Sequence, residues 1–351
     1  MVETLARRDI RKLSLEELKE FFVQHGDKVF RAQQVYEWLW KKSAKDFDQM
    51  TNLSLATREL LKNHFVINFI QVDSMQRSAD GTIKNAVKLH DGLIVESVLI
   101  PTEKRITACV SSQVGCSLAC RFCATARLKR MRNLNPDEIY DQVVAIQQQC
   151  DLFFGRPLTN IVFMGMGEPL LNYSNVMTAI EKITSPKGLN MASKRLTVST
   201  VGIAKMIMKM ADDGVKFNLA VSLHSALDEV RSSIMPINDT NSLEELGDAL
   251  KYWYKKTKKK VTYEYVVWKG INDTEVHAQA LLKFCQIIPC KVNLIEYNPI
   301  DDGEFQQASE DALNMYMHLL EMNGITTRVR KSRGKDIDAA CGQLANKSID
   351  N

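Results

Sequence analysis

Strands and helices alternate along the chain from about residue 106 to residue 331, and this alternation limits the folds that the sequence can adopt. The strand candidates are short apolar segments, and they lie at residues 106–112, 160–165, 195–200, 216–224, 261–267, 291–297 and 325–331. Stretches with helical periodicity lie between several of them, at residues 136–149, 174–183, 242–254 and 275–288. Repeated strand–helix units predict an α/β fold with a parallel sheet and right-handed crossovers. We count too few units for a closed eight-fold barrel, so we expect an open, partial β/α barrel.

The segments before this alternation have different periods. Ser14 and Glu17 match a capping box for a helix that stops near Gly26, and residues 29–42 again show apolar residues at helical spacing. Residues 69–100 alternate every second residue, as antiparallel strands do, with Asp-Gly turns between them. We therefore divide the chain into four parts. They are a small helical accessory domain (1–65), a β-rich connecting segment (66–108), the barrel core with a C-terminal catalytic segment (109–345) and a tail (346–351).

Composition narrows the class of protein. The 351 residues are 45% hydrophobic and 25% charged, which is typical of a globular protein with an ordinary core. No apolar run approaches the length of a membrane span, and the N-terminal residues do not resemble a signal peptide, so we expect a cytoplasmic protein without a membrane partner. The net charge is only +4, but basic residues form four clusters, which favours a polyanionic partner. The clusters are at residues 7–12, 121–132, 251–260 and 328–335.

Three of the eight cysteines form a compact motif. Cys116, Cys120 and Cys123 have the spacing C-x3-C-x2-C on a loop that follows a strand candidate. In a reducing compartment, such a group indicates metal binding rather than disulfides. A [4Fe-4S] cluster held by three cysteines keeps one iron without a cysteine ligand, and that iron can bind the amino and carboxylate groups of S-adenosylmethionine (SAM). The alternative is a structural zinc site with Cys109 or a distant residue as the fourth ligand.

Polar residues follow several of the predicted parallel strands. Gly165 to Glu168 follow the strand at 160–165, and Ser199 lies at the end of the next. Ser222 to His224 and Asn298 end two further strands. The carboxyl ends of parallel strands meet at one edge of the sheet, so these residues suit a small polar ligand at the mouth of the barrel.

Segments around these residues resemble the radical SAM RNA adenine methyltransferases of the RlmN/Cfr type. The resemblance covers nearly the whole chain, in the family's order, and rests on CVSSQVGCSLACRFCAT, FMGMGEPLLN, STVGI, VSLHSA, MPIN, GIND, LIEYNP and DIDAACGQL. GEPLLN is similar to the branch that methylates adenine C2 in 23S rRNA and, in some members, in tRNA. The resemblance implies an iron–sulfur enzyme that uses two SAM per turnover and takes electrons from a donor such as flavodoxin.

The resemblance also implies roles for single residues. Cys116, Cys120 and Cys123 match the ligands of the cluster. The positions that match SAM contacts are Gly167, Glu168, Ser199, Ser222, Leu223, His224 and Asn298. Cys341 matches the cysteine that carries the methyl group, and a 5′-deoxyadenosyl radical then removes hydrogen from that S-methyl group. Cys109 matches the cysteine that resolves the covalent adduct with RNA through a transient disulfide with Cys341. Glu96 matches the proposed proton acceptor.

Three alternatives stay open at this point. The chain can belong to the resistance branch, which methylates C8, or it can be a radical SAM enzyme with a protein or metabolite substrate. It can also be a zinc-bearing RNA-binding protein without enzymatic activity. The loop after Cys123 departs from many relatives, because it reads ATARLKRMRNL and has no glycine. Lys129 and Arg130 in this loop add positive charge that suits phosphate contacts.

Overall fold

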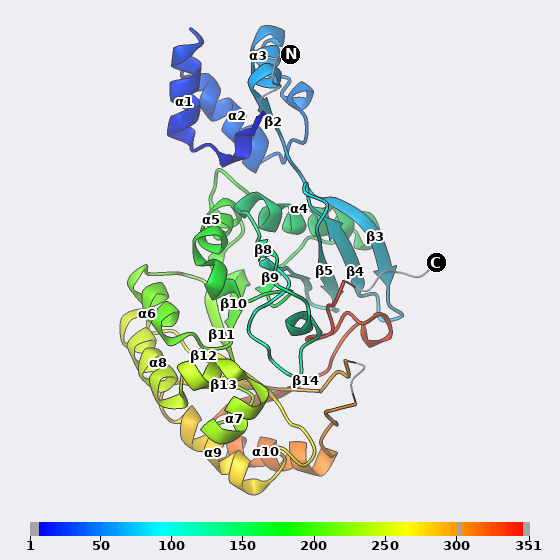
Figure 1. Cartoon of the computed structure of the whole chain (residues 1–351), viewed down its shortest axis with the longest axis vertical. Coiled ribbons are helices and arrows are strands. Elements are labelled where there is room, and N and C mark those ends of the chain that lie inside the picture. The colour runs from blue at the N-terminus through cyan, green and yellow to red at the C-terminus, as the bar shows by residue number, and fades with distance from the viewer. Residues whose placement is uncertain (1–6, 301–302, 347–351) are drawn as a thin grey trace.

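The computed structural model describes residues 7–300 and 303–346, and its centre is one ten-stranded sheet (Figure 1). The strand order is β14-β13-β12-β11-β10-β9-β6-β5-β4-β3. The parallel strands are β6 (Ile106–Cys109), β9 (Asn160–Phe163), β10 (Leu196–Thr200), β11 (Asn218–Ser222), β12 (Val261–Val266), β13 (Cys290–Ile295) and β14 (Thr326–Arg330). The predicted α/β fold is confirmed, and in the part of the chain described β14 and β3 lie at the two edges of an open sheet.

Three antiparallel strands extend this sheet. They are β3 (Gln71–Arg77), β4 (Ile83–Lys88) and β5 (Ile94–Pro101), and β5 pairs with β6 so that Val98 lies opposite Cys109. The β-rich segment and the parallel strands therefore share one continuous sheet. Almost all of β5 is buried, on both of its faces, which alternation in the sequence did not predict. The β3–β4 turn and Glu96 of β5 contact the C-terminal segment. This segment therefore covers the second face of β5.

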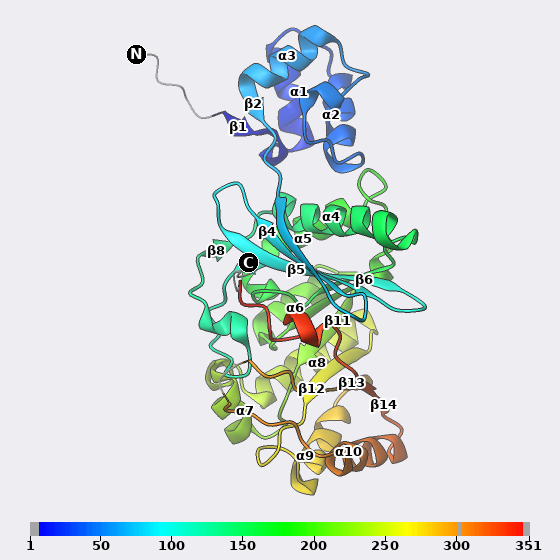
Figure 2. The same ribbon diagram turned by 90° about the vertical axis from the view of Figure 1, so that its right-hand side faces the viewer.

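Helices cover the outer side of the parallel strands (Figures 1 and 2). They are α4 (Pro136–Phe154), α5 (Tyr173–Thr184), α6 (Ala204–Asp212), α8 (Leu243–Thr257), α9 (Glu275–Cys285) and α10 (Glu310–Met322). The short helix α7 (Asp228–Ile234) lies instead at the carboxyl ends of the strands, where the Arg121 amide donates to the Ile234 carbonyl oxygen at 3.1 Å. The sequence prediction missed α6, α7 and α10. Among the described residues, no helix is long and apolar enough to span a membrane.

The N-terminal module is helical, as predicted. It contains α1 (Leu15–Gln24), α2 (Phe30–Trp40) and α3 (Leu55–His64), and its ends meet in a short parallel pair of β1 (Arg8–Asp9) and β2 (Phe65–Val66). The predicted capping box is present, because the Glu17 amide donates to Ser14 Oγ and the Ser14 amide donates to the Glu17 carboxylate.

A buried ion-pair group joins this module to the core. The Arg11 guanidinium donates to Asp141 at 2.7 Å and to Asp137 at 3.3 Å, and both carboxylates are on α4. All three side chains are almost completely buried. Removal of one partner would leave an uncompensated buried charge, so this group fixes how the module sits on the core.

Candidate active site

A cavity of about 470 Å³ lies at the carboxyl ends of the parallel strands. It is lined by residues of the cysteine loop, of several strand ends and of the C-terminal segment. The predicted site residues among them are Cys109, Cys116, Cys120, Cys123, Gly167, Glu168, Ser199, Ser222, His224, Asn298 and Cys341. Of the residues predicted for the site, Leu223 and Glu96 do not line it. Leu223 is fully buried beside the cavity, and its amide donates to the Glu264 carbonyl oxygen at 3.0 Å.

The cysteine loop is closed at its base by a two-stranded pair. β7 (Gln113–Val114) pairs antiparallel with β8 (Arg132–Asn133), so the residues between them form one excursion at the cavity. Gly115 makes the closure possible. Its φ is +74°, and a Cβ at this position would lie 2.4 Å from the Lys129 carbonyl oxygen. The backbone at the base of the loop is therefore close enough to require a glycine before Cys116, whereas the segment after Cys123 adopts its conformation without one.

The three cysteines of the loop fit a cluster that they share. All three line the same cavity, Cys120 is buried, and burial raises the pKa of Cys116 to about 11 and also raises those of Cys120 and Cys123. Thiolates are the ligands that iron–sulfur clusters require, so cluster binding would have to deprotonate these buried thiols. Among the described residues, no three or more His, Cys, Asp or Glu side chains are gathered to hold a single metal ion. The fit therefore rests on the donor type and on the cavity that the three thiols share.

Glu168 and His224 are buried polar residues at two of the strand ends. The Glu168 carboxylate accepts hydrogen bonds from the amides of Leu170 at 3.0 Å and Val201 at 2.9 Å, and burial raises its pKa to about 7. His224 Nδ1 accepts from the Val266 amide at 3.2 Å, and burial together with the nearby Arg231 lowers the pKa of His224 to about 3. A neutral histidine with one nitrogen already occupied suits a ligand contact better than proton transfer near neutral pH.

Two buried polar atoms on the cavity wall have no partner among the described residues. They are Asn298 Oδ1 and Trp268 Nε1, and both side chains are almost fully buried. An unpaired buried donor or acceptor costs free energy, so these atoms fit a ligand that accepts from the indole and donates to the amide. Trp268 was missed by the sequence analysis, because an aromatic residue directly after a strand is usually part of the core.

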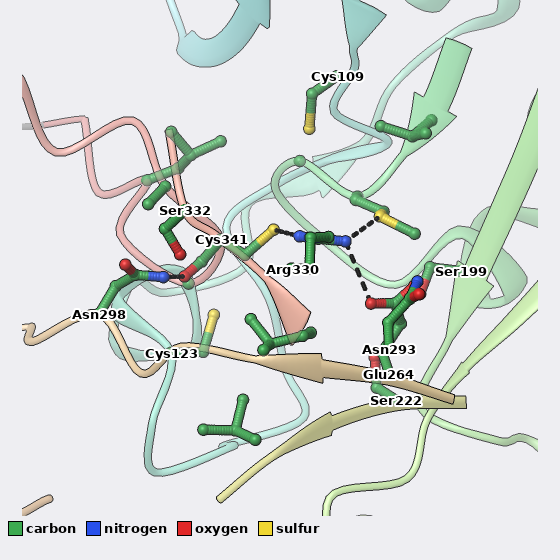
Figure 3. Close-up of a pocket in the computed structure, with 18 of the residues that line it drawn as sticks. Cys109, Cys123, Ser199, Ser222, Glu264, Asn293, Asn298, Arg330, Ser332 and Cys341 are labelled. Carbon is green, nitrogen blue, oxygen red and sulfur yellow. Dashed lines mark hydrogen bonds and ion pairs between the residues drawn. The ribbon is translucent and has the colours of Figure 1, made fainter. Parts of the chain in front are cut away.

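Arg330 lies beside Cys109 and Cys341, the two cysteines that the family resemblance pairs. Its guanidinium donates to Cys341 Sγ and to Glu264 Oε2, the latter at 3.1 Å, and Asn293 donates to the other Glu264 oxygen at 2.8 Å (Figure 3). Figure 3 shows Cys109 pointing into the same space from β6. Burial raises the pKa of Cys109 to about 12, with a further increase from Cys341, so Cys109 is a thiol at neutral pH. Arg330, Glu264 and Asn293 were not predicted as site residues.

The remaining cysteines lie outside the cavity. Cys150 is buried in α4, and Cys285 and Cys290 are buried where α9 leads into β13. Nothing in the sequence predicted a functional role for these three cysteines.

Comparison with known proteins shows the class of enzyme to which this chain belongs. Residues 110–282 match the profile of the radical SAM superfamily, and residues 8–67 match the N-terminal domain of ribosomal RNA large subunit methyltransferases. The crystal structure of a radical SAM methyltransferase from Sphaerobacter thermophilus is 38% identical, with a TM-score of 0.90 over 96% of this chain and 99% of that one. The protein is thus a radical SAM enzyme, a class that uses SAM and an iron–sulfur cluster.

Curated relatives narrow the class to one family. A protein of Christiangramia forsetii named "Probable dual-specificity RNA methyltransferase RlmN" is 70% identical over 97% of each chain. A protein of Streptococcus agalactiae with the same name is 40% identical over 97% of this chain and 94% of its own length. The chain therefore belongs to the RlmN family of radical SAM RNA methyltransferases.

Proposed function

We propose that this protein methylates C2 of an adenine in 23S rRNA, and of an adenine in tRNA, through an S-methylcysteine on Cys341. The observation that carries the proposal is the meeting of Cys109 and Cys341 with the three loop cysteines around one cavity. Cys109 comes from β6 and Cys341 from the C-terminal segment, so only the fold brings them together. A radical SAM enzyme that acts on a protein or a metabolite has no evident need for this second pair.

The cofactors match the residues present. Cys116, Cys120 and Cys123 would hold a [4Fe-4S] cluster, and Glu168, Asn298 and the other strand-end residues would contact SAM. When bound, the cluster and SAM supply the 5′-deoxyadenosyl radical. This chemistry suits adenine C2, because that carbon lies between two ring nitrogens and is too electron-poor to attack a methyl sulfonium directly.

The chain's own residues divide the remaining work. Arg330 donates a hydrogen bond to Cys341 Sγ and so holds the sulfur that takes up the methyl group. The Cys341 sulfur takes up a methyl group from one SAM, which leaves as S-adenosylhomocysteine. Removal of one hydrogen atom, which the radical from a second SAM would accept, lets the S-linked carbon bond to adenine C2, and the adduct loses one electron and the C2 proton. Cys109 gives up its proton and attacks the Cys341 sulfur, so the bond between that sulfur and the carbon breaks, the carbon takes up a proton as a methyl group, and a transient disulfide remains. A donor such as flavodoxin supplies the electrons, and reduction of the disulfide restores both thiols.

RNA access follows from the same geometry. An adenine stacked in a duplex cannot reach a cavity inside a sheet, so the target base comes from a loop or is flipped out of its stack. The N-terminal helical module, held to α4 by Arg11, would bind RNA structure while the cavity takes one nucleotide.

The test is mass spectrometry of nucleosides from rRNA and tRNA after incubation with anaerobically reconstituted protein, SAM and a reductant. We expect 2-methyladenosine with the wild type and none with Cys341→Ala. A product of 8-methyladenosine would move the protein to the resistance branch. An intact cluster that cleaves SAM without any methylated adenosine would favour the protein or metabolite substrate.

A further inference from the structure

We propose that Glu96 is a positioning residue that holds the Cys341 segment in place, a role beyond the one that the family resemblance implies for it. Glu96 lies on β5, is 2% exposed and does not line the cavity. Its Oε2 accepts hydrogen bonds from the backbone amides of Ala345 at 2.8 Å and Asn346 at 3.2 Å. These amides lie four and five residues after Cys341 in the sequence.

The other oxygen of the Glu96 carboxylate also has a charged neighbour. Lys84 Nζ on β4 lies 3.5 Å from Oε1, and both side chains of this pair are almost completely buried. Three of the four lone-pair positions of the carboxylate therefore contact groups of the protein. A buried carboxylate with such partners is a rigid anchor.

The C-terminal segment is bound from two sides, and Glu96 holds one of them. On the side of the cysteine loop, the Ala124 amide donates to the Gly342 carbonyl oxygen at 2.7 Å and Thr125 Oγ1 donates to that of Leu344 at 2.6 Å. On the side of β5, the Glu96 contacts are joined by a bond from Asn346 Nδ2 to the Ile94 carbonyl oxygen at 2.7 Å. Figures 1 and 2 show the segment in red beside β4 and β5.

This attachment fixes where Cys341 lies. Asn298 Nδ2 donates to the Cys341 carbonyl oxygen at 3.3 Å, and the anchored residues 342–346 follow directly after this cysteine. The inference rests on the proposed function only in that Cys341 carries the methyl group. Catalytic groups must be held within a fraction of an ångström, so a loosened anchor lowers methyl uptake without a change in any group that touches the substrate.

The experiment compares Glu96→Gln with Glu96→Ala by two readouts on the full-length, cluster-loaded protein. The first is hydrogen exchange of the amides of residues 342–346, and the second is the S-methyl occupancy of Cys341 after incubation with SAM. Glutamine keeps one acceptor oxygen for the two amides, whereas alanine keeps none. We expect Glu96→Ala to speed exchange about tenfold or more, as the loss of a charged hydrogen bond requires, and to lower occupancy. We expect Glu96→Gln to stay within about threefold of the wild type in both.

Two further variants keep the test independent of Glu96 itself. Asn346→Gly removes the bond to Ile94 and suits the φ of +51° at this position, so we expect faster exchange there with Glu96 intact. The matched control is Asp336→Ala, because Asp336 anchors the same segment upstream, by bonds from Ser78 Oγ at 2.6 Å and the Ala79 amide at 3.1 Å. This control should loosen residues 334–338 and leave the amides of Ala345 and Asn346 protected.

Two results would overturn the inference. One is unchanged exchange in Glu96→Ala. The other is normal S-methyl occupancy of Cys341 in Glu96→Ala despite faster exchange, since the anchor would then not determine where Cys341 lies. Failure of the proposed function looks different, because Cys341 would then gain no methyl group in the wild type while the order of exchange rates among the variants persists.

Discussion

Replacement of Arg330 by methionine tests how the site holds the Cys341 sulfur for methyl uptake. Arg330→Met keeps much of the side-chain volume but removes the donor to Cys341 Sγ and to the Glu264 carboxylate. A hydrogen bond to a charged group contributes about 2 kcal/mol, which corresponds to roughly a 30-fold change in rate. We therefore expect methyl uptake by Cys341 to slow about 30-fold.

The same change has a second consequence that must be separated from the first. Glu264 is 4% exposed, and without Arg330 its carboxylate keeps, among the residues that the structure describes, only the hydrogen bond from Asn293. Loss of one partner of a buried ion pair destabilises a protein by about 3–5 kcal/mol. The Arg330 side chain is 32% exposed, so solvent screening reduces this to about 1–2 kcal/mol.

A matched double variant separates stability from activation. Arg330→Met with Glu264→Gln removes the uncompensated charge, so we expect thermal stability to return while methyl uptake stays slow. Arg330→Lys keeps a cation and should retain part of the rate. The assay is the mass of the intact protein during a single anaerobic incubation with SAM. A wild-type rate in Arg330→Met, or recovery of the rate in the double variant, would refute the role of Arg330 as a donor to the Cys341 sulfur.

Three further predictions follow from the geometry of the site and its loop. Trp268→Phe keeps the ring and removes the unpaired Nε1 donor, so SAM should bind the cluster-loaded protein roughly fivefold more weakly by equilibrium dialysis, and an unchanged Kd would contradict a ligand role. His224 is neutral in the folded protein down to about pH 3, whereas in the unfolded chain it binds a proton below its ordinary pKa of 6.5. Its contribution to stability is therefore complete above pH 6.5 and lost as the pH falls toward 3, by about 1.4 kcal/mol per pH unit. Urea unfolding of the cluster-free protein should show this slope, and His224→Asn, which tolerates the φ of +57°, should remove it; an equal slope in both would count against a buried neutral histidine. Lys129 and Arg130 are exposed on the cysteine loop, and we expect them to contact RNA phosphates. Changing both to Ala should reduce the slope of log binding constant against log salt concentration by up to about 1.5. An unchanged slope would exclude phosphate contacts by these two residues.

The parts of the site that depend on local pattern could be predicted from the sequence. The cysteine spacing and the polar residues at strand ends are local features, and the parallel order of the strands brings them together at one edge of the sheet. Cys109 and Cys341 were paired only through the family resemblance, because nothing in their own surroundings in the sequence connects them.

Contacts between distant segments could not be predicted in this way. Arg330 was counted in a basic cluster at residues 328–335, and the fold turns it toward the cavity, where it meets Glu264 and Cys341. Glu96 alternates with apolar residues on β5 and resembles a solvent-facing residue, until the C-terminal segment covers it. The missed helix α7 has only seven residues, too few for a periodic pattern, whereas α6 does carry apolar residues at helical spacing that a longer search of the sequence would find.

The central claim is that the methyl group passes through Cys341 on its way to adenine. The most direct measurement is a chase experiment with methyl-labelled SAM. The anaerobic protein first receives labelled SAM without RNA, then an excess of unlabelled SAM with rRNA, and both the peptide that contains Cys341 and the RNA nucleosides are analysed by mass spectrometry. We predict that the label appears on Cys341 and then moves into 2-methyladenosine in the first turnover. Label that stays on Cys341 while unlabelled methyl groups enter the RNA would contradict the account.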